Sequence, residues 1–161
     1  MASAPAAPRH SDPAGADAHA SRPQPTGAGS DVLVELPASA DGPATGRRCA
    51  YTVISAWGAG EQLAETAVLV VSELVTNALR DGAPPIRLRV ARDPAGHLVL
   101  AVYDGGSRLP SLGSDHLDIA EPAENGFGLQ LVDALARTWA TTPDPVAGKT
   151  VTAHLTWQDR R

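Results

Sequence analysis

The spacing of apolar residues predicts two consecutive helices. In residues 61–80, apolar side chains recur three and four positions apart and fill one broad half of a helical wheel of about 100° per residue. Residues 41–57 group Val53, Ile54 and Trp57 on one side, and glycines follow. Both segments are long enough and periodic enough to be amphipathic helices that cover an apolar layer.

Apolar residues that recur at every second position predict the strands. Residues 31–37 form a short strand ended by a proline, and residues 85–92 alternate apolar side chains with arginines. Residues 97–103 are apolar almost throughout, as expected for a strand in the middle of a sheet. The remaining expected elements are a helix at about 127–137, a strand near 138–141 and a strand over 149–157.

This order of elements predicts an α/β (α+β) two-layer sandwich, in which one mixed sheet carries helices on a single face. Residues 31–157 would form the domain, and residues 158–161 a short C-terminal tail. Residues 105–125 are rich in Gly, Pro, Ser and acidic side chains, and make a loop longer than compact domains usually hold without a function.

The first 30 residues predict a disordered tail. They consist largely of Ala, Pro, Gly, Ser and Asp and have almost no large apolar side chain, so folding could not offset the ordering entropy. A docking peptide for a partner is the functional alternative for this segment.

Composition narrows the class of protein. The chain has 161 residues, a net charge of -5 without a long run of either sign, and one cysteine, Cys49. The negative net charge disfavours direct binding to nucleic acid or to an anionic membrane. A single cysteine excludes an intrachain disulfide and a cysteine zinc site. We see neither a secretory signal nor a run of apolar residues long enough to span a membrane, so the sequence predicts a cytoplasmic protein.

A carboxylate and an amide stand one turn apart in the helix of residues 61–80. Glu73 and Asn77 lie on its polar half, with Asn77 at the border of the apolar arc. Such a pair either belongs to a solvated face or points into a cleft and handles a charged ligand.

Asp104 directly follows the apolar strand, and two glycines come next. A carboxylate at the end of a buried strand can accept a hydrogen bond from an exocyclic amine such as that of adenine. An Asp-Gly hairpin turn is the alternative, although no strand follows closely enough for a tight hairpin.

Glycines also stand at the start of the third helix. Gly126 and Gly128 allow an anion to approach the helix N-terminus, yet a lone G-x-G is weak evidence and the third glycine of the dinucleotide fingerprint is missing. The sequence Gly148-Lys149-Thr150 mimics the end of a P-loop. A strand follows it instead of a helix, which excludes that interpretation.

The order of these four features closely resembles the GHKL ATPase superfamily of gyrases, heat-shock chaperones, histidine kinases and MutL. The stretches are E-L-V-T-N-A, D-x-G after a strand, G-x-G-L and G-x-T, and together they cover roughly residues 31–157. The short single-domain form resembles the branch of anti-sigma factors and serine protein kinases, especially small actinobacterial ATP-binding regulatory proteins. The resemblance implies a Bergerat-type ATP-binding fold with a mostly antiparallel sheet.

The resemblance also implies roles for individual residues, with ATP and Mg²⁺ as cofactors. Asn77 would coordinate Mg²⁺, and Glu73 would orient or deprotonate the attacking hydroxyl. Asp104 would bind the adenine amino group. The remaining implied binding residues are Gly106 beside the base, Gly126, Gly128 and Leu129 at the phosphate side, and Thr150 in support of the adenine site.

Three departures from the family pattern bear on activity. Phe127 stands where many relatives have a basic residue between the glycines, and Asp81 stands where relatives often have histidine. Residues 107–125, which the resemblance implies to be the ATP lid, carry several acidic side chains and would lie near a triphosphate. ATP binding is therefore better supported than phosphotransfer.

Two functions follow as hypotheses. The first is a regulator of the anti-sigma-factor type that binds Mg²⁺-ATP and phosphorylates Ser or Thr on a small antagonist protein, with a sigma factor as a further partner. The second is a non-catalytic partner-switching module that uses ATP as a structural ligand or not at all. Relatives often form homodimers, and a histidine kinase fragment is disfavoured because no phosphoacceptor hairpin precedes the domain.

Overall fold

The computed structural model describes residues 30–108 and 127–160 of the chain. Within them, five strands and three helices follow one another along the chain. Their bounds are β1 (Asp31–Leu36), α1 (Asp41–Ala56), α2 (Glu61–Asp81), β2 (Ile86–Arg92), β3 (His97–Asp104), α3 (Phe127–Leu135), β4 (Thr138–Pro143) and β5 (Lys149–Thr156).

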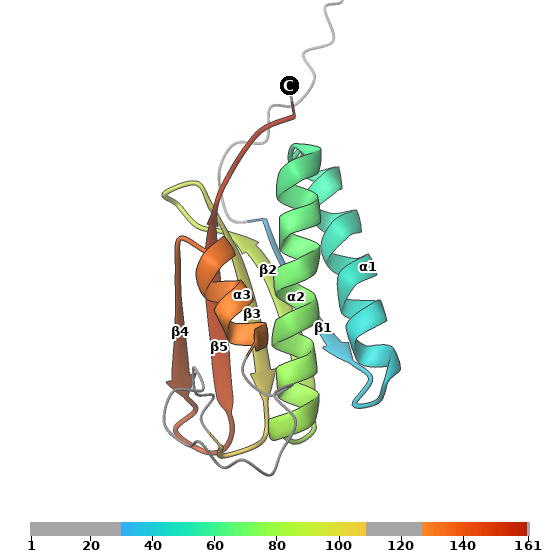
Figure 1. Ribbon diagram of the computed structural model, residues 1–161, viewed down its shortest axis with the longest axis vertical. Helices are drawn as coiled ribbons and strands as arrows, with labels where there is room; N and C mark the ends of the chain where they lie inside the picture. Colours follow the sequence, from blue (N-terminus) through green and yellow to red (C-terminus); the bar gives the residue numbers. More distant parts are fainter. Residues whose placement is uncertain (1–29, 109–126, 161) are drawn as a thin grey trace, which may run out of the picture.

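The strands form one sheet in the order β1-β2-β3-β5-β4. Each neighbouring pair of described strands runs antiparallel, so no pair within residues 30–108 and 127–160 supplies the parallel part of a mixed sheet. The three helices lie on one face of the sheet (Figure 1). The predicted two-layer α/β sandwich is confirmed.

Helix α2 is the centre of the helix layer, with α1 on one side and α3 on the other (Figure 1). Nine of its residues are buried, and all of them except Asn77 are apolar, as the broad apolar half of the helical wheel predicts. Gly46 lets α1 approach α2 closely, since a methyl group there would lie 3.2 Å from Val71 Cγ1. The core is aliphatic, as the low aromatic content requires; its fully buried members include Ile54, Leu74, Ile86, Leu88, Leu98, Leu100, Val70, Val71, Val75, Val90 and Val102.

The strand predictions are confirmed in their periodicity. On β2, Ile86, Leu88 and Val90 are buried while Arg87 and Arg89 are exposed. On β3, buried positions run without a break for five residues, as expected for the central strand.

Two predicted bounds differ from the structure by two residues, and the others differ by at most one. Helix α3 ends at Leu135, two residues before the predicted end, because the amide of Arg137 already donates to the carbonyl of His154 on β5. Strand β4 continues to Pro143 instead of ending at 141, since its pairing with β5 extends that far.

The residues that follow β5 are held against the loop between α1 and α2. The amide of Gly60 donates to the carbonyl of Gln158 at 2.8 Å, and the amide of Arg160 donates to the carbonyl of Gly58 at 2.9 Å. These bonds fix the last described residues beside the start of α2.

Several expectations lie outside the described residues. They are the disorder of the N-terminal tail up to residue 29, the greater part of the acidic loop, Gly126, and the side chain of Phe127. In the part of the chain that the structure does describe, no helix is both long and apolar enough to cross a membrane.

Candidate functional site

One member of the polar pair of α2, Asn77, does not lie on a solvated face. Asn77 is 5% exposed and Glu73 is half-buried, although both belong to the polar half of the helical wheel. The amide of Asn77 is therefore held inside the molecule, where a polar group needs hydrogen-bond partners. This excludes the solvated-face interpretation of the pair for Asn77.

The partner of Asn77 is a neighbouring guanidinium. Arg80 Nη2 donates to Asn77 Oδ1 at 3.0 Å and to Asp81 Oδ2 at 2.8 Å. Arg108 also approaches Asp81, with 3.7 Å between Nη1 and Oδ1. Two arginines thus pair with Asp81 at the C-terminal end of α2, and one of them, Arg80, also contacts the amide of Asn77.

Glu73 faces the start of α3. A methyl group on Gly128 would lie 2.5 Å from Glu73 Oε2, so the glycine leaves the space that the carboxylate occupies. Gly128 is in the first turn of α3, where backbone amides have no partner within the helix. The structure therefore brings a carboxylate and a helix N-terminus together.

Asp104 ends β3 and is buried, with 1% of its side chain exposed. Its Oδ1 accepts from the amide of Gly106 at 2.9 Å and from Lys149 Nζ at 3.0 Å. Lys149 is the first residue of β5 and stands directly opposite Asp104 in the register of the two strands. The carboxylate is therefore paired with a buried ammonium.

Close backbone packing surrounds this carboxylate. Gly82 follows the last residue of α2, and a methyl group on it would collide with the carboxylate of Asp104 and the carbonyl of Ala78. A methyl group on Gly106 would lie 2.7 Å from the Cα of Gly82. Asp104 thus lies against the C-terminal end of α2, about one turn beyond Asn77.

Two other predicted site residues lie elsewhere. Thr150 is half-buried and alternates with the buried residues of β5, so it belongs to the helix-free face of the sheet and pairs with Tyr103 and Thr142. Leu129 is buried in the hydrophobic core under α3. The structure does not bring Thr150 to Asp104; Lys149, the residue before it, is the one that contacts this carboxylate.

The sequence interpretation therefore missed Lys149 and Gly82. The sequence did contain a sign that Lys149 is buried, because this residue is in phase with Val151, Ala153 and Leu155, which are all buried. A charged residue in phase with a buried row needs a partner, and the predicted end of the central strand offered Asp104.

Metal binding in this region would depend on few protein ligands. Among residues 30–108 and 127–160, no group of three or more His, Cys, Asp or Glu side chains could hold an ion. Mg²⁺ usually keeps several waters and is held by one or two protein oxygens together with substrate phosphates. Asn77 Oδ1 accepts one described hydrogen bond, and a carbonyl oxygen has two lone pairs, so it fits such a ligand.

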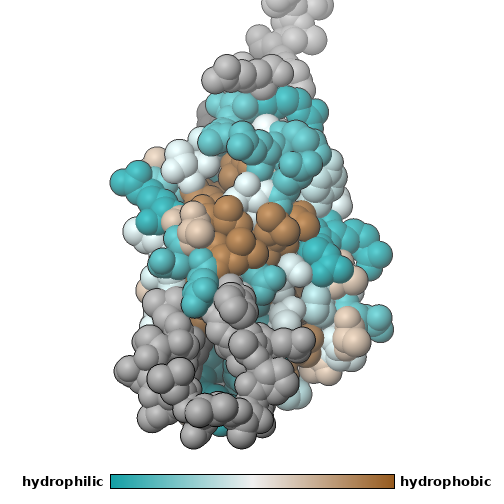
Figure 2. All heavy atoms as spheres, viewed as in Figure 1, coloured by the Kyte–Doolittle hydropathy of each residue, from teal (hydrophilic) through white to brown (hydrophobic). Residues whose placement is uncertain are grey.

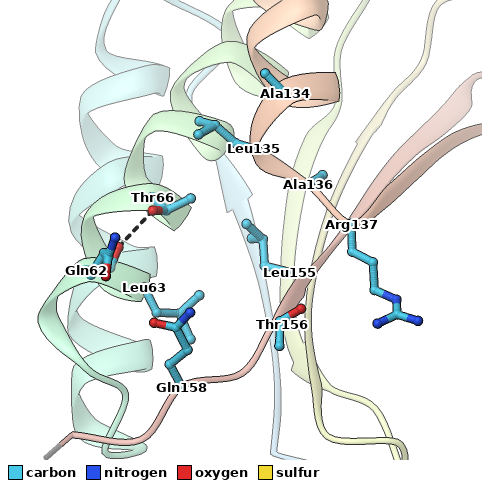
Figure 3. A pocket seen from close by; sticks show the side chains of 10 residues that line it. All are labelled: Gln62, Leu63, Thr66, Ala134, Leu135, Ala136, Arg137, Leu155, Thr156 and Gln158. Atoms are coloured by element: carbon cyan, nitrogen blue, oxygen red, sulfur yellow. Dashed lines mark hydrogen bonds between the residues drawn. The ribbon is translucent and has the colours of Figure 1, made fainter.

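A separate hollow of ≈ 450 Å³ lies at the other end of α2. Figure 3 shows its lining side chains, which come from the first turns of α2, from the end of α3 and the two residues after it, and from the end of β5 and Gln158. Thr66 Oγ1 donates to the carbonyl of Gln62 at its wall. None of the predicted site residues lines it.

On the same side of the molecule, apolar side chains gather over α2 and α3 between polar ones (Figure 2), and Leu69 of α2 is 49% exposed.

Comparison with known proteins gives one family and one fold. A family described as histidine kinase-like ATPase domain matches residues 36–155. The crystal structure of the RsbU and RsbW domains of Rv1364c from Mycobacterium tuberculosis superposes with a TM-score of 0.60 at 20% sequence identity. The alignment covers 81% of this chain and 34% of that one, so the chain spans about a third of the length of this relative. No curated protein matches the sequence significantly.

Proposed function

The chain belongs to the histidine kinase-like ATPase domain family, and from its site we propose that it is a Mg²⁺-ATP-binding regulatory protein of the anti-sigma-factor type. One observation carries the proposal. Buried Asp104 lies against the C-terminal end of the same helix that presents Glu73 and Asn77, and Gly128 meets Glu73. A base-binding carboxylate at the end of β3 would thus lie beside the helix that carries the phosphate-side groups Glu73 and Asn77.

The glycines position the carboxylate proposed to bind the base. Gly82 and Gly106 pack backbone to backbone beside Asp104, and a methyl group on either would collide with atoms of the protein. Because both lack a side chain, the end of α2 and the end of β3 can approach each other this closely. Asp104 would accept from the amino group of the adenine, and the first amides of α3 would face the phosphates.

The residues present also fit the metal. Asn77 Oδ1 would hold Mg²⁺ with its second lone pair, while Arg80 keeps the amide oriented. When bound, Mg²⁺-ATP supplies a transferable γ-phosphoryl group whose negative charge the metal partly neutralises. Arg80 and Arg108 both pair with Asp81, so the two guanidinium groups and one carboxylate leave a net positive charge at the same end of α2.

Glu73 is the proposed base. Its half-buried carboxylate beside the N-terminus of α3 would orient a Ser or Thr hydroxyl of a partner protein and take its proton during phosphoryl transfer. Catalysis would rest mainly on positioning and charge stabilisation. The proposed partners are a small antagonist protein as substrate and a sigma factor as target, and a second copy of this chain is a further one.

A second function is favoured by a specific observation. Asp104 is already paired with Lys149, and Asn77 already accepts from Arg80, so both side chains have partners inside the protein. A partner-switching module that binds ATP only as a structural ligand, or not at all, would be built this way.

Calorimetric titration with Mg²⁺-ATP tests the nucleotide site. We expect binding in the micromolar to sub-millimolar range for the wild type, and loss of at least about tenfold in affinity for Asn77→Ala and Asp104→Asn. Thr152→Val, on the helix-free face of β5, is the matched control and should bind like the wild type. A folded wild type that binds no ATP would overturn the proposal.

Phosphotransfer needs its own test. Proteins that co-purify with the chain would be incubated with ATP labelled at the γ-phosphate, with the wild type and with Glu73→Ala. Label that appears on a partner only with the wild type supports the kinase. If ATP binds but the two proteins give equal labelling or none, the chain is the non-catalytic module.

A further inference from the structure

The ammonium of Lys149 is buried beside the carboxylate proposed to bind adenine. Its side chain is 1% exposed, and Nζ lies 3.0 Å from Asp104 Oδ1. A lysine ammonium has three N–H donors. In the part of the chain that the structure describes, Asp104 is the acceptor that Nζ contacts, which uses one of them.

We propose that Lys149 determines base specificity by donating a hydrogen bond to the adenine ring nitrogen at position 1. The inference rests on the proposed function and extends it from Asp104 to the pair. Adenine presents a donor, its amino group, next to an acceptor, this ring nitrogen. Asp104 and Lys149 present an acceptor next to a donor, 3.0 Å apart, in the complementary order.

The position of Lys149 indicates a role beyond packing of the core. It continues the row of Val151, Ala153 and Leu155, where an apolar side chain would complete the packing. A buried ion pair is weak support for stability, because replacement by apolar residues is often neutral or stabilising. A donor beside the base-binding carboxylate gives the pair a use that an apolar residue lacks.

The same arrangement discriminates between purines. A base with a carbonyl at position 6 and a protonated nitrogen at position 1, as in ITP, would direct its oxygen at Asp104 and its N–H at Lys149. An acceptor would then face the acceptor Asp104, and a donor would face the donor Lys149. We therefore expect ATP to be preferred over ITP by a factor of at least about ten, the cost of one unmade hydrogen bond to a charged group.

The decisive probe is 1-deaza-ATP, in which a C–H group replaces the ring nitrogen and the amino group is kept. Titrated with Mg²⁺ into the wild type, it should bind about 10- to 100-fold more weakly than ATP. The control nucleotide is 7-deaza-ATP, which leaves this edge of the base unchanged and should bind within about threefold of ATP.

The matched variant is Lys149→Met, which keeps most of the length of the side chain and removes the donor. It should bind ATP and 1-deaza-ATP equally, whereas Thr152→Val on the same strand should retain the wild-type discrimination. The comparison of nucleotides on the wild type decides the matter even if Lys149→Met does not fold.

The outcomes separate this inference from the proposed function. If ATP binds and 1-deaza-ATP binds equally well, Lys149 only balances the charge of Asp104, and the inference is overturned while the ATP site stands. If ITP binds as tightly as ATP, the pair does not select adenine. If no nucleotide binds, both are overturned, and the ion pair closes the site.

Discussion

Lys149 and Asp104 form an ion pair across β3 and β5, because the register of these antiparallel strands sets the first residue of one opposite the last residue of the other. The two residues are 45 positions apart in the chain. Both charges have lost nearly all contact with water, so each depends on the other.

We expect Lys149→Met to lower the free energy of unfolding by about 3–5 kcal/mol, because it leaves a buried carboxylate without its cation. The joint change Lys149→Met with Asp104→Leu should recover most of this loss. Urea denaturation measures both. The surface control is Arg87→Met, which breaks an exposed ion pair in which Arg87 Nε lies 3.7 Å from Glu35 Oε2. It should lower the free energy of unfolding by less than about 1 kcal/mol. A single variant as stable as this control would contradict the prediction.

Gly82 and Gly60 flank the two ends of α2 and differ in the space around them. Both have extended backbone with negative φ, so alanine is conformationally allowed at either. A methyl group on Gly82 would collide with Asp104, whereas one on Gly60 would lie 3.3 Å from its nearest neighbour, the carbonyl oxygen of Asp159. We expect Gly82→Ala to destabilise the protein by about 1–3 kcal/mol and Gly60→Ala by clearly less, measured by thermal denaturation.

Glu73 and Gly128 are predicted to be energetically coupled. Alanine favours a helix over glycine by about 0.5–1 kcal/mol, but a methyl group on Gly128 would lie 2.5 Å from Glu73 Oε2. Gly128→Ala should therefore stabilise the protein only in a Glu73→Ala background. A double-mutant cycle by urea denaturation measures the coupling. Additivity within about 0.5 kcal/mol would show that the carboxylate moves aside without cost.

The fold was predictable from local periodicity. Residues 61–80 and 85–92 each expose one face to water, so their apolar side chains recur with the period of a helix and of a strand. The border position of Asn77 on the helical wheel likewise anticipated its burial. Bounds such as the end of α3 were less predictable, because Arg137 leaves the helix to pair with a residue of β5 that lies 17 positions further along the chain.

The site was predictable only in part, because its contacts join distant segments. Asp104 could be found from its place after an apolar strand. Its pairing with Lys149 depends on the register of β3 and β5, which no local pattern specifies. The resemblance directed attention to Thr150, one residue away, and a shift of one residue on a strand exchanges the two faces of the sheet.

The contact between Asp31 and Arg89 predicts how the stability of the protein depends on pH. Arg89 joins the edge strand β1 to β2 through two hydrogen bonds to Asp31 Oδ2, from Nε at 3.0 Å and from Nη2 at 2.6 Å. These hydrogen bonds are the main reason that the pKa of Asp31 lies below its ordinary value of 3.8. A carboxyl group whose pKa is depressed by folding stabilises the native state while it is ionised.

The stabilisation is therefore present above about pH 4 and is lost as the pH falls through the lowered pKa of Asp31. We expect Asp31→Asn to reduce the free energy of unfolding at pH 7, by less than about 1 kcal/mol because both side chains are well exposed, and this loss should shrink as the pH falls through the lowered pKa of Asp31. Urea denaturation at pH 7 and at a series of lower pH values measures the difference. Glu35→Gln, on the same strand but with a longer contact to Arg87, is the control and should change stability less at pH 7. A destabilisation by Asp31→Asn that persists at low pH would mean that packing of the side chain, and not its charge, holds β1 to β2.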